Sequence, residues 1–253
     1  MLSSDLPARP FVIGHRGGGV RSAAGGFFEN TVAGCVNAVA QGASWVEVDV
    51  RLNADRELVL SHAVHPADRV PVFTMTCSAC RQAGLATLEQ VHAALPPEVG
   101  ICLEVKVGVA DATGPAAVDA CIAWAAAHRD ERPILITSFD PSVAAAAAAY
   151  RLPTGWLTWI GWAFTESVTS AARLGCAVAV CHAPEVVASF PDADLGPEVL
   201  RELLERTGVR LWVYDALADH VPALLAAGVT GLITDDVAGV VAALAAHERN
   251  TPS

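Results

Sequence analysis

Short apolar runs alternate with alanine-rich stretches of helical periodicity along the whole chain. The apolar runs have the length of buried strands, and the stretches between them repeat apolar residues every three or four positions, as helices do. Because strands that alternate with helices form parallel sheets, eight such units predict one closed (β/α)8 barrel, the TIM-barrel fold. The predicted strands are residues 11–15, 45–52, 100–106, 133–139, 154–160, 176–181, 210–214 and 231–234.

Each predicted strand is followed by a helical pattern with recognisable end signals. Four glycines stand where a helix C-terminus favours a left-handed residue: Gly42, Gly175, Gly208 and Gly228. The helices are expected to begin near Thr31, Thr87, Ala116, Pro141, Glu166, Pro197, Ala218 and Val237.

One irregular stretch interrupts the pattern after the second strand. Residues 58–62 predict an antiparallel hairpin arm, and residues 63–86 form a long insertion without a clear element. The insertion would lie over the carboxyl ends of the strands, where barrel enzymes hold their active sites, so it is a candidate lid. Because no Pro-, Gly- or Ser-rich linker divides the chain, we expect residues 1–253 to form a single domain.

Composition and net charge indicate which classes of binding partner are compatible with the chain. Hydrophobic residues make up 53% of the chain and charged residues 17%, which suffices for a large core. The net charge of -11 and the absence of a Lys/Arg run argue against nucleic acid as a partner. An anionic small-molecule substrate would therefore need positive charge supplied locally, by a bound cation and a few basic side chains.

The sequence also carries expectations about the cellular environment. No basic segment followed by an apolar run opens the chain, and no apolar run is long enough to span a bilayer, so we expect a cytoplasmic protein without stable membrane insertion. Seven cysteines fit buried free thiols in a reducing compartment better than a disulfide framework. The oligomeric state is left open.

Charged side chains gather where the second and third predicted strands lie. Glu47 and Asp49 are two residues apart and share one face of a strand, as do Glu104 and Lys106. Carboxylates that converge in a pocket repel one another unless a hard cation such as Mg²⁺ or Ca²⁺ neutralises them. The pattern therefore predicts a site for a divalent cation.

Two histidines complete the candidate chemistry. His15 follows the first strand and His62 follows the hairpin arm. A phosphodiester is a poor electrophile with a basic leaving group, so a metal can offset its charge while an acid protonates the departing oxygen. Because the pKa of histidine lies near neutral pH, one imidazole can accept a proton from the nucleophile while the other donates one. These residues predict a phosphodiesterase.

Five polar motifs occur in a fixed order along the chain: Gly14-His15-Arg16-Gly17, Glu29-Asn30-Thr31, Glu47-Val48-Asp49, His62 and Glu104-Val105-Lys106. In these motifs the chain resembles the glycerophosphodiester phosphodiesterase family. The likeness covers nearly the whole chain and extends to Ala86-Thr87-Leu88-Glu89, Thr137-Ser138-Phe139, Trp212 and Gly231-Leu232-Ile233-Thr234-Asp235.

The resemblance implies a role for each matching residue. Glu47, Asp49 and Glu104 would hold one divalent cation, Mg²⁺ or Ca²⁺, and His15 and His62 would act as acid and base. The products would be glycerol 3-phosphate and an alcohol, with either water or the substrate's own glycerol hydroxyl as nucleophile. The other residues of the implied substrate site are Arg16 and Lys106 at the phosphate, Glu29 at a substrate hydroxyl or a metal-bound water, and Trp212 as a wall of the pocket.

Two alternatives stay open at this point. A lipid phosphodiesterase related to phospholipase D would share the barrel and the metal site but would need an exposed apolar lip. A non-catalytic phosphate-binding barrel is the other alternative, because Ala63 follows His62 where the family usually has an aspartate.

Several other polar residues are interpreted as structural. The Cys77-Ser-Ala-Cys80 step lacks a second cysteine pair at ligand spacing, so packing is favoured over a zinc or redox site. Asp235 and Asp236 are taken as a helix N-cap, and His182 as a packing residue that is also a candidate for the pocket. Four further histidines are expected to have no clustered partners: His65, His92, His128 and His220.

Overall fold

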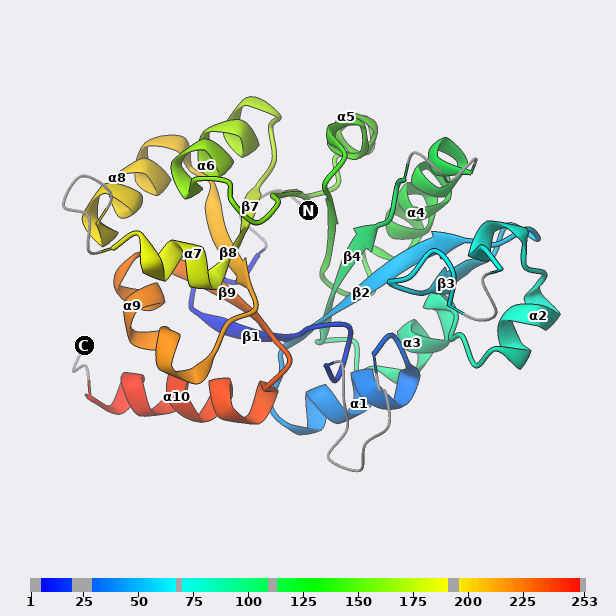
Figure 1. Cartoon of the computed structure of the whole chain (residues 1–253), viewed down its shortest axis with the longest axis horizontal. Coiled ribbons are helices and arrows are strands. Elements are labelled where there is room, and N and C mark those ends of the chain that lie inside the picture. The colour runs from blue at the N-terminus through cyan, green and yellow to red at the C-terminus, as the bar shows by residue number, and fades with distance from the viewer. Residues whose placement is uncertain (1–5, 20–28, 67–69, 109–112, 191–195, 251–253) are drawn as a thin grey trace.

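Eight parallel strands form a closed ring in the computed structural model, which describes residues 6–19, 29–66, 70–108, 113–190 and 196–250 (Figure 1). Each strand pairs with the next along the ring, and pairing of β1 with β2 closes it. This confirms the predicted (β/α)8 barrel. The strands are β1 (Phe11–Gly14), β2 (Trp45–Leu52), β4 (Gly100–Val105), β5 (Ile134–Ser138), β6 (Thr154–Leu157), β7 (Val178–His182), β8 (Arg210–Tyr214) and β9 (Val229–Thr234).

Helices surround the strands (Figure 1). Their starts follow the predicted signals: the Thr31 side chain accepts a hydrogen bond from the Gly34 N–H, and Thr87 forms a capping box with Gln90. The predicted left-handed residue ends one helix at Gly208, with φ of 67°. The helices are α1 (Val32–Ala40), α3 (Leu88–Ala94), α4 (Gly114–His128), α5 (Pro141–Ala148), α6 (Phe164–Arg173), α7 (Ala183–Ala188), α8 (Pro197–Thr207), α9 (Val221–Ala226) and α10 (Val237–Asn250), with a 3-10 turn at Ala218–His220.

The insertion has a small core of its own. β3 (Leu58–Leu60) pairs antiparallel with β2, as predicted, and the stretch expected to be irregular contains a 3-10 turn (Val72–Thr74) and the helix α2 (Cys77–Gln82). In Figure 1, α2 lies beyond the far end of the β2–β3 pair. Its buried contacts join residues of the hairpin and the insertion: Val59, Val72, Met75 and Cys80.

Two apolar layers build the barrel. Side chains on one face of the strands fill the space inside the ring, where Phe11, Trp45 and Trp212 pack with ring centroids 5.3 to 5.8 Å apart. The other face packs against the helices, and the larger core cluster lies there. The rings of the interior tryptophans pack directly on glycines of neighbouring strands. A Cβ at Gly231 would lie 2.4 Å from Trp212 Cγ, and one at Gly100 would lie 2.1 Å from Trp45, so neither position has room for a side chain.

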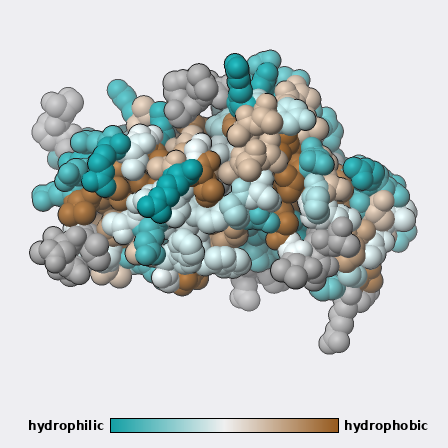
Figure 2. Space-filling view, turned by 90° about the horizontal axis from the view of Figure 1, so that it is seen from above, coloured by the Kyte–Doolittle hydropathy of each residue, from teal (hydrophilic) through white to brown (hydrophobic). Residues whose placement is uncertain are grey.

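The hydropathy of the surface and the state of the cysteines can be compared with the expectations from the sequence. On the face shown in Figure 2, hydrophobic residues lie in small groups among hydrophilic ones. Among the described residues, no helix combines the length and the apolarity that crossing a bilayer requires. All seven cysteines are free thiols, as expected.

Candidate active site

A cavity of about 460 Å³ opens at the carboxyl ends of the barrel strands. Its walls include His15, Glu47, His62, Glu104 and Lys106, so residues predicted from four separate motifs line one space. Of the described residues in the 63–86 insertion, only Val64 lines this cavity. A lid function for the insertion therefore remains a prediction.

Three carboxylates converge from two neighbouring strands. Glu47 and Asp49 lie on β2, and the β2–β4 register pairs Asp49 with Glu104. Their ligand oxygens lie within 4.8 Å of one another, and the residues are only 4%, 1% and 9% exposed. The structure thus brings together the acidic group that the alternation on the strands predicted, on the inner face of the barrel.

The acidic group fits a hard divalent cation. Burial first, and then the charge of Asp49, raise the pKa of Glu47 to about 8. Burial also raises the pKa of Glu104. Glu47 Oε1 is buried and makes no hydrogen bond within the described part of the chain. Such an oxygen is costly to leave unpaired, and a cation with oxygen ligands would satisfy it and keep all three groups ionised.

Two basic side chains neutralise the site only in part. Lys106 Nζ lies 2.8 Å from Asp49 Oδ1 and also pairs with Glu104. Arg16 Nη1 lies 2.9 Å from Glu29 Oε2, and Arg16 Nε lies 3.5 Å from Asp49 Oδ2. With a cation keeping all of them ionised, the four carboxylates exceed the two basic groups by two negative charges, which matches the charge of one Mg²⁺ or Ca²⁺.

Backbone geometry around Arg16 also serves the site. Its N–H donates to Glu47 Oε2 over 2.8 Å, and its φ of 50° lies in the left-handed region that non-glycine residues rarely adopt. This conformation turns the N–H toward the carboxylate, so the loop after β1 fixes one oxygen of Glu47 while the other stays available.

Asn30 belongs to the site through its contacts with Asp49, although no role was predicted for it. Its side-chain amide donates to Asp49 Oδ2 over 2.7 Å, and its carbonyl oxygen accepts from the Asp49 N–H over 2.9 Å. Burial opposes ionisation of Asp49, but Lys106 and Asn30 outweigh it and lower the pKa of Asp49. Its position in the Glu29-Asn30-Thr31 motif was the signal in the sequence that could have identified it as a site residue.

His15 has a carboxylate partner, Asp235, which was expected to be part of a helix N-cap. Nδ1 of His15 lies 2.7 Å from Asp235 Oδ1. The N-cap expected of both aspartates is provided by Asp236, whose Oδ1 accepts from the Gly239 N–H over 3.0 Å. Burial lowers the pKa of His15, but the hydrogen bond to Asp235 and the charge of Glu47 outweigh it, so the pKa of His15 is raised.

His62 lies at the exposed edge of the same cavity. Arg51 holds the chain here, because its guanidinium donates to the carbonyl oxygens of Ser61 (3.0 Å) and His62 (2.9 Å). The pKa of His62 is lowered, first by partial burial of its imidazole and then by the charges of Lys106 and Arg16, which together outweigh the opposing effect of Asp49. The two histidines therefore have pKa values shifted in opposite directions.

Trp212 requires a correction. It was expected to form a wall of the substrate pocket, but its side chain is fully buried and does not line the cavity. Its ring belongs to the apolar layer inside the barrel, where it packs edge-on against Phe11 and Trp45. The cavity wall is formed instead by other aromatic residues, Phe139, Trp159 and Tyr214.

The other polar residues considered lie in different places relative to the cavity. Glu29 does not line the cavity and reaches the site through Arg16. Asp215 lines the cavity, whereas His182 lines a separate, smaller pocket and lies 3.4 Å from Asp215. Cys77 and Cys80 belong to α2 and have pKa values raised above that of an ordinary thiol, which does not favour a reactive pair.

A barrel with buried carboxylates and two histidines at its carboxyl end is typical of a hydrolytic enzyme. Residues 15–238 match the glycerophosphoryl diester phosphodiesterase family. The chain therefore belongs to this family of phosphoric diester hydrolases, as its motifs indicated.

Solved structures share the fold. A glycerophosphodiester phosphodiesterase from Thermotoga maritima is 22% identical, with a TM-score of 0.72 over 92% of this chain and 98% of the other. A structure described as a putative glycerophosphodiester phosphodiesterase from Galdieria sulphuraria is 18% identical, with a TM-score of 0.76 over 93% of this chain and 98% of the other. An Oleispira antarctica phosphodiesterase, solved with the product sn-glycerol-3-phosphate, is 20% identical, with a TM-score of 0.72 over 97% and 100%. No curated protein matches the sequence.

Proposed function

We propose that the protein hydrolyses glycerophosphodiesters to glycerol 3-phosphate and an alcohol, using one Mg²⁺ or Ca²⁺ held by Glu47, Asp49 and Glu104. The observation that carries this proposal is the buried acidic group, which shares its cavity with two histidines. The product bound to the Oleispira antarctica phosphodiesterase supports the same substrate class for this chain.

The residues around the acidic group bind and orient the phosphodiester. When bound, the divalent cation supplies a positive charge that offsets the charge of the phosphate oxygens. Lys106 lies beside two of the ligands and adds positive charge on the cavity side. Arg16 also lines the cavity, and its pairing with Glu29 fixes the direction of the guanidinium.

His15 and His62 transfer the protons. His15 is oriented through Nδ1 by Asp235, so its Nε2 is the atom available to the substrate. His62 faces the same cavity from the loop after β3. One imidazole accepts the proton of the nucleophile, and the other donates a proton to the departing alkoxide, which leaves as the alcohol.

The direct test is release of glycerol 3-phosphate from glycerophosphocholine in the presence of Mg²⁺ or Ca²⁺. Loss of acid or base catalysis is worth at least about 10²-fold, so His15→Ala and His62→Ala should each lower kcat by that factor. His247→Ala, in the last turn of α10, is the matched control and should keep normal turnover. Normal turnover in both cavity variants would refute the assignment, and no release by the unaltered protein would favour a non-catalytic barrel.

Hydrolysis of a lipid phosphodiester is a second candidate function, because one wall of the cavity carries exposed apolar side chains. Trp159 and Ile160 line the cavity and are 63% and 64% exposed, and the neighbouring Trp162 is 42% exposed. Phe139 stacks on Trp159 with ring centroids 4.1 Å apart. This is the apolar lip that a lipid phosphodiesterase needs, since a substrate with an acyl chain would bury it.

A comparison of substrates tests the lip. If it binds an acyl chain, Trp159→Ala should raise KM for lysophosphatidylcholine about tenfold or more and leave KM for glycerophosphocholine within about twofold, because only the first loses apolar contact. Equal effects on both substrates, or no cleavage of the lysolipid, would exclude the lipid function.

A further inference from the structure

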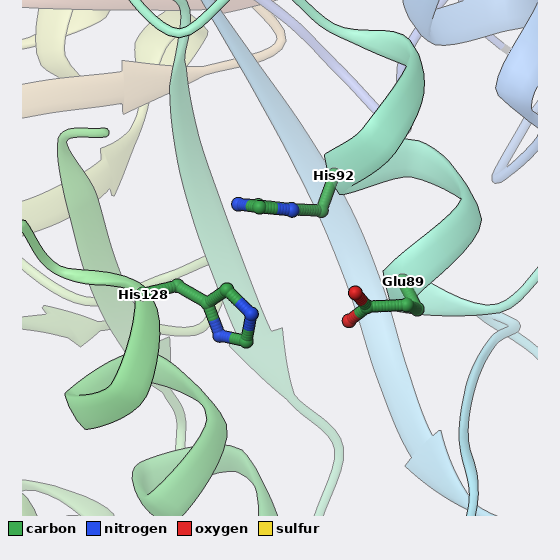
Figure 3. A group of neighbouring side chains, drawn as sticks. All are labelled: Glu89, His92 and His128. Atoms are coloured by element: carbon green, nitrogen blue, oxygen red, sulfur yellow. The ribbon is translucent and has the colours of Figure 1, made fainter. Parts of the chain in front are cut away.

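Three side chains of the types that bind metals meet on the outside of the barrel, where α3 lies near the end of α4. Glu89 and His92 lie three residues apart on α3, and His128 is the last residue of α4. Figure 3 shows the three side chains pointing into one space, and their ligand atoms lie within 4.8 Å of one another. The expectation that His92 and His128 have no clustered partners is therefore wrong, because helix packing joins positions that are distant in sequence.

We propose that Glu89, His92 and His128 form a second metal site, which binds a transition-metal ion of the Zn²⁺ type and links α3 to α4. Two imidazoles and one carboxylate suit Zn²⁺, whereas the oxygen-only group in the cavity suits Mg²⁺ or Ca²⁺. None of the three residues lines the catalytic cavity. The two sites therefore differ in both place and ligand chemistry.

The hydrogen bond of His128 leaves one ring nitrogen free to bind a metal. Nδ1 lies 2.8 Å from the carbonyl oxygen of Trp124. Because a carbonyl oxygen only accepts, Nδ1 must carry the proton, and the neutral ring keeps its lone pair on Nε2. The Trp124 ring stacks on His128 with centroids 4.4 Å apart, which fixes the plane of the imidazole.

The same tryptophan orients the carboxylate. Trp124 Nε1 donates to Glu89 Oε2 over 3.0 Å, so this exposed glutamate is held in place while Oε1 remains available. Outer groups that fix the direction of a ligand in this way are typical of built metal sites.

The imidazole of His92 packs against the rings of Trp124 and His128, with centroid distances of 5.3 and 4.5 Å. Nε2 is buried without a hydrogen bond in the described part of the structure, although Glu131 Oε2 lies 3.2 Å away. Arg132 donates to the carbonyl oxygen of His92 over 2.8 Å and so holds the end of α3 beside this site.

The test is calorimetric titration with Zn²⁺ in saturating Mg²⁺, which occupies the acidic group in the cavity. We expect one Zn²⁺ per chain, and a Tm raised by roughly 5 °C at about 100-fold excess over Kd. The variant H92Q/H128Q should bind Zn²⁺ at least about 100-fold more weakly and lose the rise in Tm, because both imidazole ligands are gone. Its turnover in Mg²⁺ should stay normal, and H247Q is the matched control. Unchanged Zn²⁺ affinity in the double variant would overturn the proposal.

X-ray absorption at the zinc edge of the unaltered protein gives a readout that does not depend on a variant folding. We expect scattering from two imidazoles and at least one oxygen. A shell of oxygen atoms alone, or no Zn²⁺ retained in the presence of Mg²⁺, would overturn the proposal, because either result would leave the acidic group in the cavity as the only metal site.

Discussion

At the scale of single residues, the acidic group was predictable and its supporting contacts were not. Glu47 and Asp49 could be read from the sequence because strand alternation places residues two apart on one face. The contact of His15 with Asp235 joins positions 220 residues apart, and no spacing rule reaches that far. Asn30 was recognised as part of a motif, but its paired hydrogen bonds to Asp49 depend on the left-handed backbone at Asn30, with φ of 56°.

The neighbouring residues Asp235 and Asp236 give a paired prediction. Asp235→Ala should lower kcat for glycerophosphocholine by about 10- to 100-fold, because His15 loses the group that orients it. Asp236→Ala should leave kcat unchanged and lower the free energy of unfolding by about 1 kcal/mol, the usual effect of losing an N-cap. Kinetics and urea unfolding on both variants distinguish the roles. A reversed pattern would show that the two roles had been exchanged.

At the scale of elements, the sequence predicted all eight barrel strands and the hairpin arm β3 but missed two short helices. α2 and α7 have six residues each, less than two turns, so they show little apolar periodicity. The equally short α9 was predicted because the 3-10 turn before it, Ala218–His220, extends the helical pattern. α7 also begins directly after β7, and its apolar residues resemble a continuation of that strand. Packing against neighbouring elements, rather than local pattern, explains why such short helices form.

The close packing of Trp212 on Gly231 predicts how a substitution at this glycine changes the free energy of unfolding. A methyl group at Gly231 would overlap the Trp212 ring, so Gly231→Ala should lower the free energy of unfolding by about 1–3 kcal/mol, as overpacking does. Gly108→Ala is the control, since a Cβ there meets nothing within 4 Å. Urea unfolding measures both, and equal stability of the two variants would mean that the ring moves aside without cost.

At the scale of the whole molecule, the protein is strongly acidic and yet is proposed to bind an anion. The net charge of -11 would repel a phosphodiester unless the cavity held positive charge. Arg16 and Lys106 supply two such charges, but both are already paired with carboxylates. A bound cation resolves the conflict and at the same time satisfies the buried Glu47 oxygen.

Metal dependence of glycerophosphocholine cleavage tests this central claim most directly. After a chelator has removed bound metal ions, the protein should be inactive, and added Mg²⁺ or Ca²⁺ should restore turnover. Glu47→Gln should lower the restored kcat by about 100-fold or more, because a neutral amide binds the ion more weakly than a carboxylate. Full turnover in the presence of chelator, or an undiminished response to metal in Glu47→Gln, would contradict the account.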